Sequence, residues 1–418
     1  MSRYLYIVAL VIAGEMVFGL PFNIERFFRP TMLEVFGFTN TQLGDLFVIY
    51  GITAMLSYFP GGALADRFPA RNLLTASLFA TSAGGLYMAT IPGPVGMGWL
   101  YGFWGVTTIF LFWGALIRAT REWGADSSQG AAFGLLEGGR GLVAATVAVL
   151  LAGVFAVLMP DDPRTATDAE RLAGFRAVIL GFTAVTVIAG VLTWFLVPHS
   201  NEVERAQRNP LRNMLLVLRR PIVWAQAAII VCAYCGYKAV GFYVQYLYEV
   251  MDFDEVQSNR IVSYGAYVRP VAALAAGLIA DRFDATRTVG ALFLIMAIAY
   301  VVLGIAAPDT AGHLVIYLNL VISLVAVFAL RGVYFALLQE TRTPRQITGA
   351  AVGLVSVVGF TPEIFFAPIA GRILDATPGI GGFHNLFFFL AAFGAAGVAV
   401  VFCLLFLKRN NLRREPVT

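Results

Sequence analysis

Long apolar runs alternate with short polar breaks along the whole chain. A helix that crosses the hydrocarbon core of a bilayer needs roughly 20 mostly apolar residues, and about twelve runs reach that length. The pattern predicts an all-α membrane protein with about twelve transmembrane helices. Their expected centres, in chain order, are Ala13, Ile52, Ala80, Ile109, Ala148, Val185, Val231, Val268, Leu294, Ser323, Val358 and Gly394.

Two polar breaks are longer than the others. "PDDPRTATDAERLAG" follows the fifth run, and "PHSNEVERAQRNPLRN" follows the sixth and divides the chain almost in half. We therefore expect an N-terminal six-helix bundle over residues 1–197, a cytoplasmic linker over 198–220, and a C-terminal six-helix bundle over 221–418 that ends in a short cytoplasmic tail.

Composition agrees with a membrane protein and narrows its chemistry. Of the 418 residues, 59% are hydrophobic and 13% are charged, whereas a soluble domain carries about a quarter charged residues. The net charge of +4 comes from basic residues that punctuate the apolar runs, so we expect a lipid bilayer and no nucleic acid as partner. Three Cys and three His form no motif for a disulfide framework or a metal, and we expect neither metal nor cofactor.

The basic residues also predict the orientation. An even number of spans places both termini on one side, and cytoplasmic loops hold the excess of Lys and Arg. With the N-terminus inside, seventeen basic residues fall in cytoplasmic loops and seven in the opposite loops. We expect both termini in the cytoplasm and a multi-pass protein of the bacterial inner membrane, acting as a monomer.

A short sequence repeats between the two halves. "GALADRF" (Gly62 to Phe68) recurs as "GLIADRF" (Gly277 to Phe283), and "AFGLLEGG" (Ala132 to Gly139) is echoed by "AVGLVSVV" (Ala351 to Val358). Such repeats are typical of transporters built from two bundles of the same topology.

With these motifs the chain resembles the major facilitator superfamily (MFS) of secondary transporters. Gly62 to Arg71 is similar to the superfamily's signature loop between its second and third helices, and Asp281 with Arg282 to the weaker copy in the second half. The resemblance implies two six-helix bundles and transport by alternating access. The stretch "FFRPTMLEVFGFTNTQLGDLF" also resembles the organophosphate and nitrate branches, although the Gly-rich nitrate signature is absent, so nitrate itself is not expected.

The signature loop suggests a gate. Asp66 and Arg67 follow the second expected helix closely, where they either fix topology and cap helix ends or form a latch. The resemblance implies a latch partner near Thr348 and Gly349, and the repeat implies a second latch near Gln129 and Gly130. The expected gating residues are Asp66, Arg67, Arg71, Arg121, Asp281 and Arg282.

Ionisable residues at membrane depth are costly and mark candidate sites. Arg269 is the strongest candidate, since Pro270 follows it and we expect the helix to bend there and free local carbonyls; the alternative is that Arg269 is a buried partner of Glu15 or Glu363. Glu137 and Arg140, three apart, are read as an intrahelical pair.

The remaining intramembrane charges suggest a positive pocket. We expect the solute to be bound by Arg269, Lys238 and Arg331, with Tyr234 and Tyr237 in the wall, because Arg grips carboxylates and phosphates with paired hydrogen bonds. Glu15 and Glu363 are the candidates for proton coupling, which motivates H⁺ as the coupling ion.

The function predicted is secondary active transport, in symport with protons, of a small polar or anionic organic solute. The alternatives are an exporter of amphipathic or siderophore-like molecules, or a non-transporting sensor with the same fold. An enzyme is not expected, because the chain offers no His-rich metal cluster and no nucleophile elbow.

Overall fold

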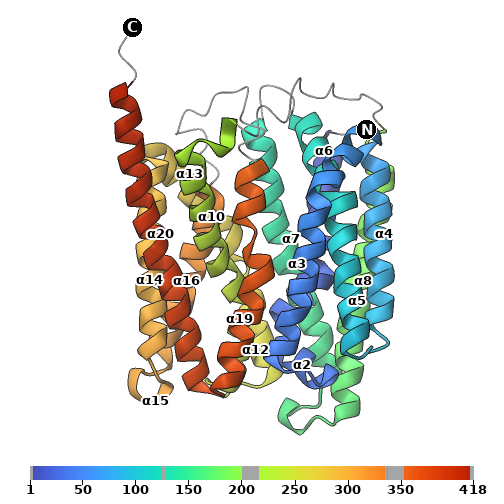
Figure 1. The fold of residues 1–418 in the computed structure, drawn as a ribbon. Helices are drawn as coiled ribbons and strands as arrows, with labels where there is room; N and C mark the ends of the chain where they lie inside the picture. Colours follow the sequence, from blue (N-terminus) through green and yellow to red (C-terminus); the bar gives the residue numbers. More distant parts are fainter. Residues whose placement is uncertain (1–2, 125–128, 200–215, 335–336, 338–352, 415–418) are drawn as a thin grey trace. The chain divides into compact units, whose positions relative to one another are not determined.

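The computed structural model describes residues 3–124, 129–199, 216–334, 337 and 353–414 (Figure 1). Within these ranges the regular structure is helical, with no strand. Nine of the described helices are long and apolar enough to cross a membrane, and the number rises to eleven if each of two bent helix pairs is one span. Every expected centre lies in a helical segment; the run around Ala80 forms α4 (Ala70–Met88), which is not among these candidate spans.

Contacts divide the chain into two compact units. The first comprises Met1–Arg205, Gly241–Pro270 and Ala367–Asp375, and the second comprises Ala206–Val240, Val271–Phe366 and Ala376–Thr418. Much of the expected linker lies outside the described residues, so the division into two bundles at residues 198–220 stays a prediction.

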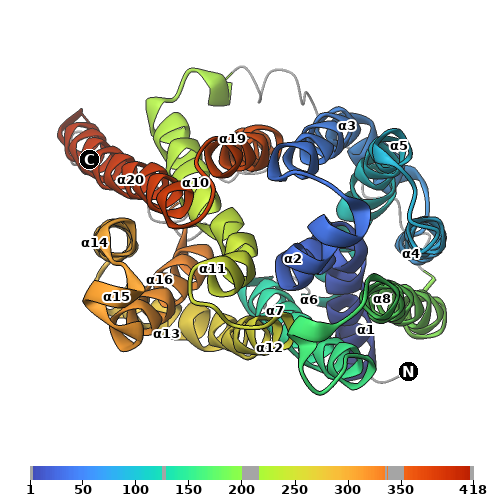
Figure 2. The same cartoon turned by 90° about the horizontal axis from the view of Figure 1, so that it is seen from below.

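The first unit contains all the described α-helices of residues 3–196 and two further helices from the second half of the chain. Its helices are α1 (Arg3–Met16), α2 (Ile24–Phe36), α3 (Asn40–Arg67), α4 (Ala70–Met88), α5 (Pro94–Gly105), α6 (Gly114–Gly124), α7 (Gln129–Leu158), α8 (Asp168–Leu196), α11 (Tyr243–Glu249) and α12 (Glu255–Gly265). Figure 2 shows α2, α11 and α12 side by side, in agreement with their contacts.

The second unit is built around α10 (Pro221–Ala239), which packs against α16 (His313–Val333) and α20 (Ile380–Arg414). Also in this unit are α14 (Ala285–Ile305) and the short α15 (Pro308–Ala311). Two helices, α13 (Val268–Phe283) and α19 (Pro362–Ala376), begin in one unit and continue in the other.

Helix breaks lie beside two of the intramembrane charges. A π-helical segment, Gly19–Asn23, joins α1 to α2 at a 44° bend, and Glu15 lies next to the last residue of α1. Between α12 and α13 the helix is interrupted at residues 266–267. Pro270 has no N–H to donate to the Ala266 carbonyl, and the Arg269 N–H donates to it instead, at 3.1 Å. The break lies in the turn before Pro270, and Arg269 and Pro270 themselves are in the first turn of α13.

Candidate functional site

One cluster of predicted site residues lies in the second unit. Tyr237 and Lys238 follow Tyr234 by three and four residues and therefore lie on its side of α10. Arg331 lies on α16, and Glu363 is in the first turn of α19. We call these five residues the Lys238 cluster.

Glu363 is the centre of the Lys238 cluster. Lys238 Nζ lies 2.9 Å from Glu363 Oε2, and the Tyr234 hydroxyl donates a hydrogen bond to Glu363 Oε1. Both charged side chains are largely buried, with 7% and 13% of their surface exposed. Pro362 is the first residue of α19, and Glu363 is in its first turn, where the positive end of a helix favours a carboxylate.

Arg331 completes the cluster through an aromatic contact. Its guanidinium carbon lies 3.9 Å from the centroid of the Tyr237 ring, within the range of a cation–π interaction. The Tyr234 ring in turn contacts Phe360 edge-on, with centroids 5.0 Å apart. The cluster therefore combines two cations, one carboxylate and phenol groups on aromatic walls, a set that can bind an anionic group on an organic body.

A second cluster lies in the first unit, where Glu15 meets two arginines from other helices. Glu15 Oε2 lies 3.3 Å from Arg140 Nε and 3.8 Å from Arg269 Nη1, and Asn23 donates to Glu15 Oε1 at 3.3 Å. Arg269 Nη2 also lies 3.5 Å from Glu137 Oε2. Two acids and two cations balance, as the cost of burying charge requires. We call Glu15, Glu137, Arg140 and Arg269 the Glu15 cluster.

The Glu15 cluster contains two of the contacts that the sequence suggested. The intrahelical pair of Glu137 and Arg140 is present, and Arg269 contacts Glu15, while its role toward a solute stays a prediction. Arg269 belongs to the first unit and the Lys238 cluster to the second. Their joint action on one solute therefore stays a prediction.

Sequence reasoning missed a buried arginine on α2. Arg29 has no exposed surface, and its Nε donates to Gln245 Oε1 at 2.8 Å while Nη2 donates to Asn40 Oδ1 at 3.1 Å. Its Nη1 pairs with Glu25, and its guanidinium lies 4.1 Å from the centroid of the Phe242 ring. The only local signal was Glu25 four residues before Arg29, which is the spacing of a helical ion pair.

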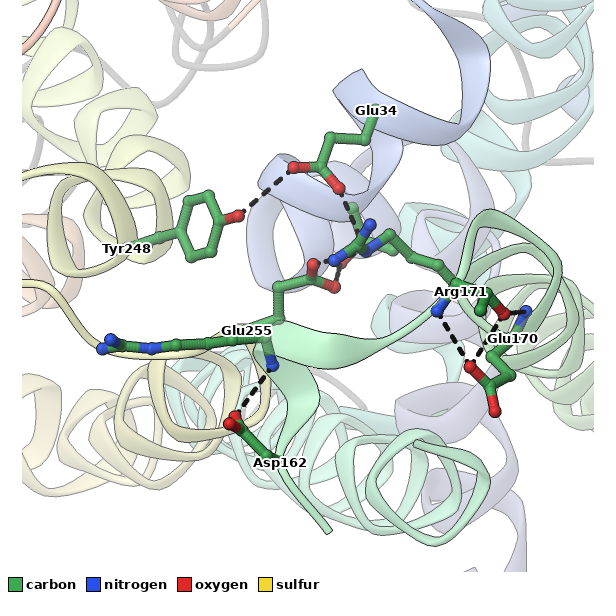
Figure 3. A network of polar contacts seen from close by, with 9 residues as sticks. Glu34, Asp162, Glu170, Arg171, Tyr248 and Glu255 are labelled. Carbon is green, nitrogen blue, oxygen red and sulfur yellow. Dashed lines mark hydrogen bonds and ion pairs between the residues drawn. The ribbon is translucent and has the colours of Figure 1, made fainter. Parts of the chain in front are cut away.

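A further missed network joins α2, α8, α11 and α12 (Figure 3). Arg171 on α8 lies between two carboxylates, with its Nε 2.7 Å from Glu255 Oε1 and 3.1 Å from Glu34 Oε2. The Thr31 hydroxyl donates to Glu255 at 3.0 Å, and the Tyr248 hydroxyl to Glu34 at 3.2 Å. We call these five residues the Arg171 cluster.

An acid also lies at the N-terminus of α3. Asp375 accepts hydrogen bonds from the backbone N–H of Asn40 at 3.2 Å and of Thr41 at 2.7 Å. Next to it, Arg372 Nη1 lies 2.9 Å from Asp45 Oδ1. An acid at a helix N-terminus is the arrangement that we expected for Asp66, and here it lies at the opposite end of the helix that carries Asp66.

The predicted gating residues lie at helix ends, and their predicted pairings stay predictions. Asp66, Arg67, Arg121 and Arg282 are exposed, and the Arg71 guanidinium lies 4.3 Å from the centroid of the Trp194 ring. Outside the described parts are Thr348, Gly349 and the side chains of Gln129 and Asp281.

The described residues contain no group of three or more His, Cys, Asp or Glu side chains that could hold a metal ion. Cys232 and Cys235 are buried as free thiols in α10. The candidate sites are therefore the charge clusters.

Comparison with known proteins points to one family. Residues 11–367 match the model of the Major Facilitator Superfamily. The chain is 28% identical over 425 residues to inner membrane protein YqcE of Escherichia coli (strain K12), covering 99% of this chain and 97% of that one. It is 24% identical over 358 residues to the probable nitrate/nitrite antiporter NarK1 of Thermus thermophilus, covering 80% and 77%.

The fold also matches a solved structure. A bacterial homolog of the human lysosomal transporter Spinster, in an inward-facing and unoccupied conformation, superposes with a TM-score of 0.75 at 15% identity, covering 99% of this chain and 98% of that one. The predicted all-helical membrane fold is confirmed.

Proposed function

The chain belongs to the Major Facilitator Superfamily and is a secondary transporter, not an enzyme, and we propose that it moves a small polar or anionic organic solute in symport with protons. Alternating access of two bundles, divided at residues 198–220, is the transport mechanism that we propose. The remaining proposals concern the solute, the coupling ion and the residues that serve them.

The Lys238 cluster is the observation that carries this proposal. Lys238 and Arg331 bring two positive charges to a buried site, and Glu363 brings one negative charge. Charged side chains within a membrane span usually belong to a functional site, because each one is costly to insert into the bilayer. A carboxylate or phosphate on the solute would restore the balance of charge, while Tyr234 and Tyr237 would contact its organic body.

The pairing of Lys238 with Glu363 suggests how the proton enters. While Glu363 is ionised, it pairs with the Lys238 ammonium and competes with an incoming anion for that positive charge. A proton on Glu363 removes that competition, so proton and anion bind together more favourably than either binds alone. This linkage is the physical basis of symport.

We propose the same exchange for the Glu15 cluster. Protonation of Glu15 would leave Arg140 and Arg269 with one carboxylate, that of Glu137, between them. Arg269 would then be a second contact for the anion. A preference for anionic solutes is compatible with the relative NarK1, which is named for an inorganic anion. We also propose that the chain is related to the organophosphate and nitrate branches of the superfamily.

The protein is a multi-pass membrane protein, and we propose the inner membrane as its location, as for YqcE. We also propose that both termini are cytoplasmic and that the protein is a monomer. Reporter fusions at each end test the first, and mass measurement in detergent tests the second.

A ligand screen tests the nature of the solute. Purified protein is heated with sets of carboxylated, phosphorylated and cationic metabolites, since a bound solute raises the apparent stability by RT ln(1 + [L]/Kd). We expect a stabilising compound in a carboxylated or phosphorylated set, and we expect Lys238→Gln to abolish its effect. Lys408→Gln is the matched control, because Lys408 contacts Thr286 and Asp284 and is not part of the cluster.

The outcome of the screen distinguishes the alternatives. Stabilisation by cationic or amphipathic compounds alone, unchanged in Lys238→Gln, would contradict the proposal and favour the exporter.

A further inference from the structure

Three polar side chains on α12 are enclosed by protein. Ser258, Asn259 and Ser263 are 0%, 1% and 0% exposed. The two serine hydroxyls and both polar atoms of the Asn259 amide have no hydrogen-bond partner within the described chain. Buried polar atoms are almost always paired, so a group of them on one helix calls for a physical reason.

These residues lie on one side of α12 and continue a line that begins at Glu255. Positions 255, 259 and 263 are successive turns apart, and Ser258 is next to this line. Val256 and Val262 are the buried apolar residues of the same helix. The face therefore has the composition of a surface that contacts water, although it is enclosed in this structure.

Burial of unpaired amide and hydroxyl groups is unfavourable, because water would satisfy them. A conformation that hydrates this face gains those hydrogen bonds. Something else must then favour the enclosed arrangement.

The Arg171 cluster supplies that stabilisation at the first turn of α12. Glu255 is 3% exposed and bridges α12 to α8 through Arg171 and to α2 through Thr31. Asp254 caps the helix at the same point, since its side chain accepts from the Gln257 N–H at 2.8 Å. The ion pair fixes the end of α12 directly next to the enclosed polar face.

We propose that Ser258, Asn259 and Ser263 line the water-filled pathway of the solute in another conformation, and that the Arg171 cluster holds this face closed. The inference rests on the proposed transport function. Hydroxyl and amide groups offer both donors and acceptors, which suits the passage of a hydrated polar solute.

Thiol labelling of the full-length protein in detergent tests this proposal. With Cys232, Cys235 and Cys403 replaced, Asn259→Cys and Ser263→Cys are each treated with a water-soluble methanethiosulfonate that carries a sulfonate, and modification is timed by mass spectrometry. The reagent needs water at the thiol, because the thiolate is the reactive form. Ala148→Cys, at a fully buried apolar position of α7, is the control.

We expect slow labelling of both cysteines in the parent. Arg171→Gln should accelerate it by about tenfold or more, because loss of one partner of a buried ion pair strongly destabilises the closed arrangement. Arg171→Lys should restore part of the slow rate. Glu34 is a half-exposed partner of Arg171, so Glu34→Gln should accelerate labelling less than Arg171→Gln does. It replaces Arg171→Gln as the test variant if Arg171→Gln does not fold.

Three results would overturn the proposal. These are fast labelling in the parent, unchanged rates in both Arg171→Gln and Glu34→Gln, or equal acceleration of Ala148→Cys. The assay uses no solute, so an error in the proposed solute or coupling ion does not alter its result, and failure of the ligand screen remains distinguishable from failure here.

Discussion

Arg29 illustrates how single buried charges are stabilised in this protein. Its guanidinium cannot reach water, and it is satisfied by Glu25, Gln245 and Asn40 together with the Phe242 ring. A planar guanidinium suits this surrounding because it donates in fixed directions and stacks on aromatic rings. Its contribution differs in kind from that of an exposed pair such as Arg372 with Asp45.

The difference can be measured. Arg29→Gln should lower the free energy of unfolding by about 3–5 kcal/mol, because it leaves Glu25 buried without its counter-ion. Arg372→Gln is the control and should cost about 0–1 kcal/mol, because 56% of the Arg372 side chain and 47% of Asp45 are exposed. Thermal unfolding of both purified variants checks this, and equal losses would contradict it.

At the scale of elements, α3 and residues 367–375 of α19 approach each other through glycine. A Cβ at Gly44 would lie 2.6 Å from the Ala367 carbonyl oxygen, and a Cβ at Gly371 would overlap the Asn40 carbonyl. Close backbone approach through small residues is a common way to pack helices in membranes. The hydrogen bonds from the start of α3 to Asp375 close the same contact.

The glycine contact predicts a position-dependent effect. Gly371→Ala should destabilise the protein by about 1–3 kcal/mol, the usual cost of overpacking. Gly153→Ala is the matched control, since a Cβ there meets nothing within 4 Å, and it should be neutral or slightly stabilising because Ala is the better helix former. Thermal unfolding compares them, and a tolerated Gly371→Ala would mean that the contact adjusts freely.

Features that depend on neighbouring residues were predicted from the sequence, whereas most pairings between distant residues were missed, and the contact of Arg269 with Glu15 was named only as an alternative. The helix centres and the pair of Glu137 with Arg140 depend on residues within a few positions of one another. In contrast, Arg171 and Glu255 are 84 residues apart, and Arg29 and Gln245 are 216 apart. No periodicity connects such pairs, because tertiary packing alone brings them together.

At the scale of the molecule, the internal repeat has a structural counterpart. The first copy of the repeated motif ends α3 at Arg67, and the second ends α13 at Phe283; the next helices begin at Ala70 and Ala285. Two copies in equivalent helix–loop–helix settings agree with the duplicated architecture of the superfamily. The Glu15 cluster and the Lys238 cluster differ in their residues, so duplication of the chain alone does not explain the proposed binding of an anionic solute.

Proton movement driven by the anion is the most direct measurement of the central claim. Vesicles reconstituted with the protein and loaded with a pH-sensitive dye receive the carboxylated or phosphorylated compound that stabilises the protein most. Symport predicts acidification of the lumen, lost in Glu363→Gln, whose neutral side chain can no longer exchange a proton. Glu15→Gln is measured in parallel. Solute uptake without acidification, or full acidification in both variants, would contradict the account.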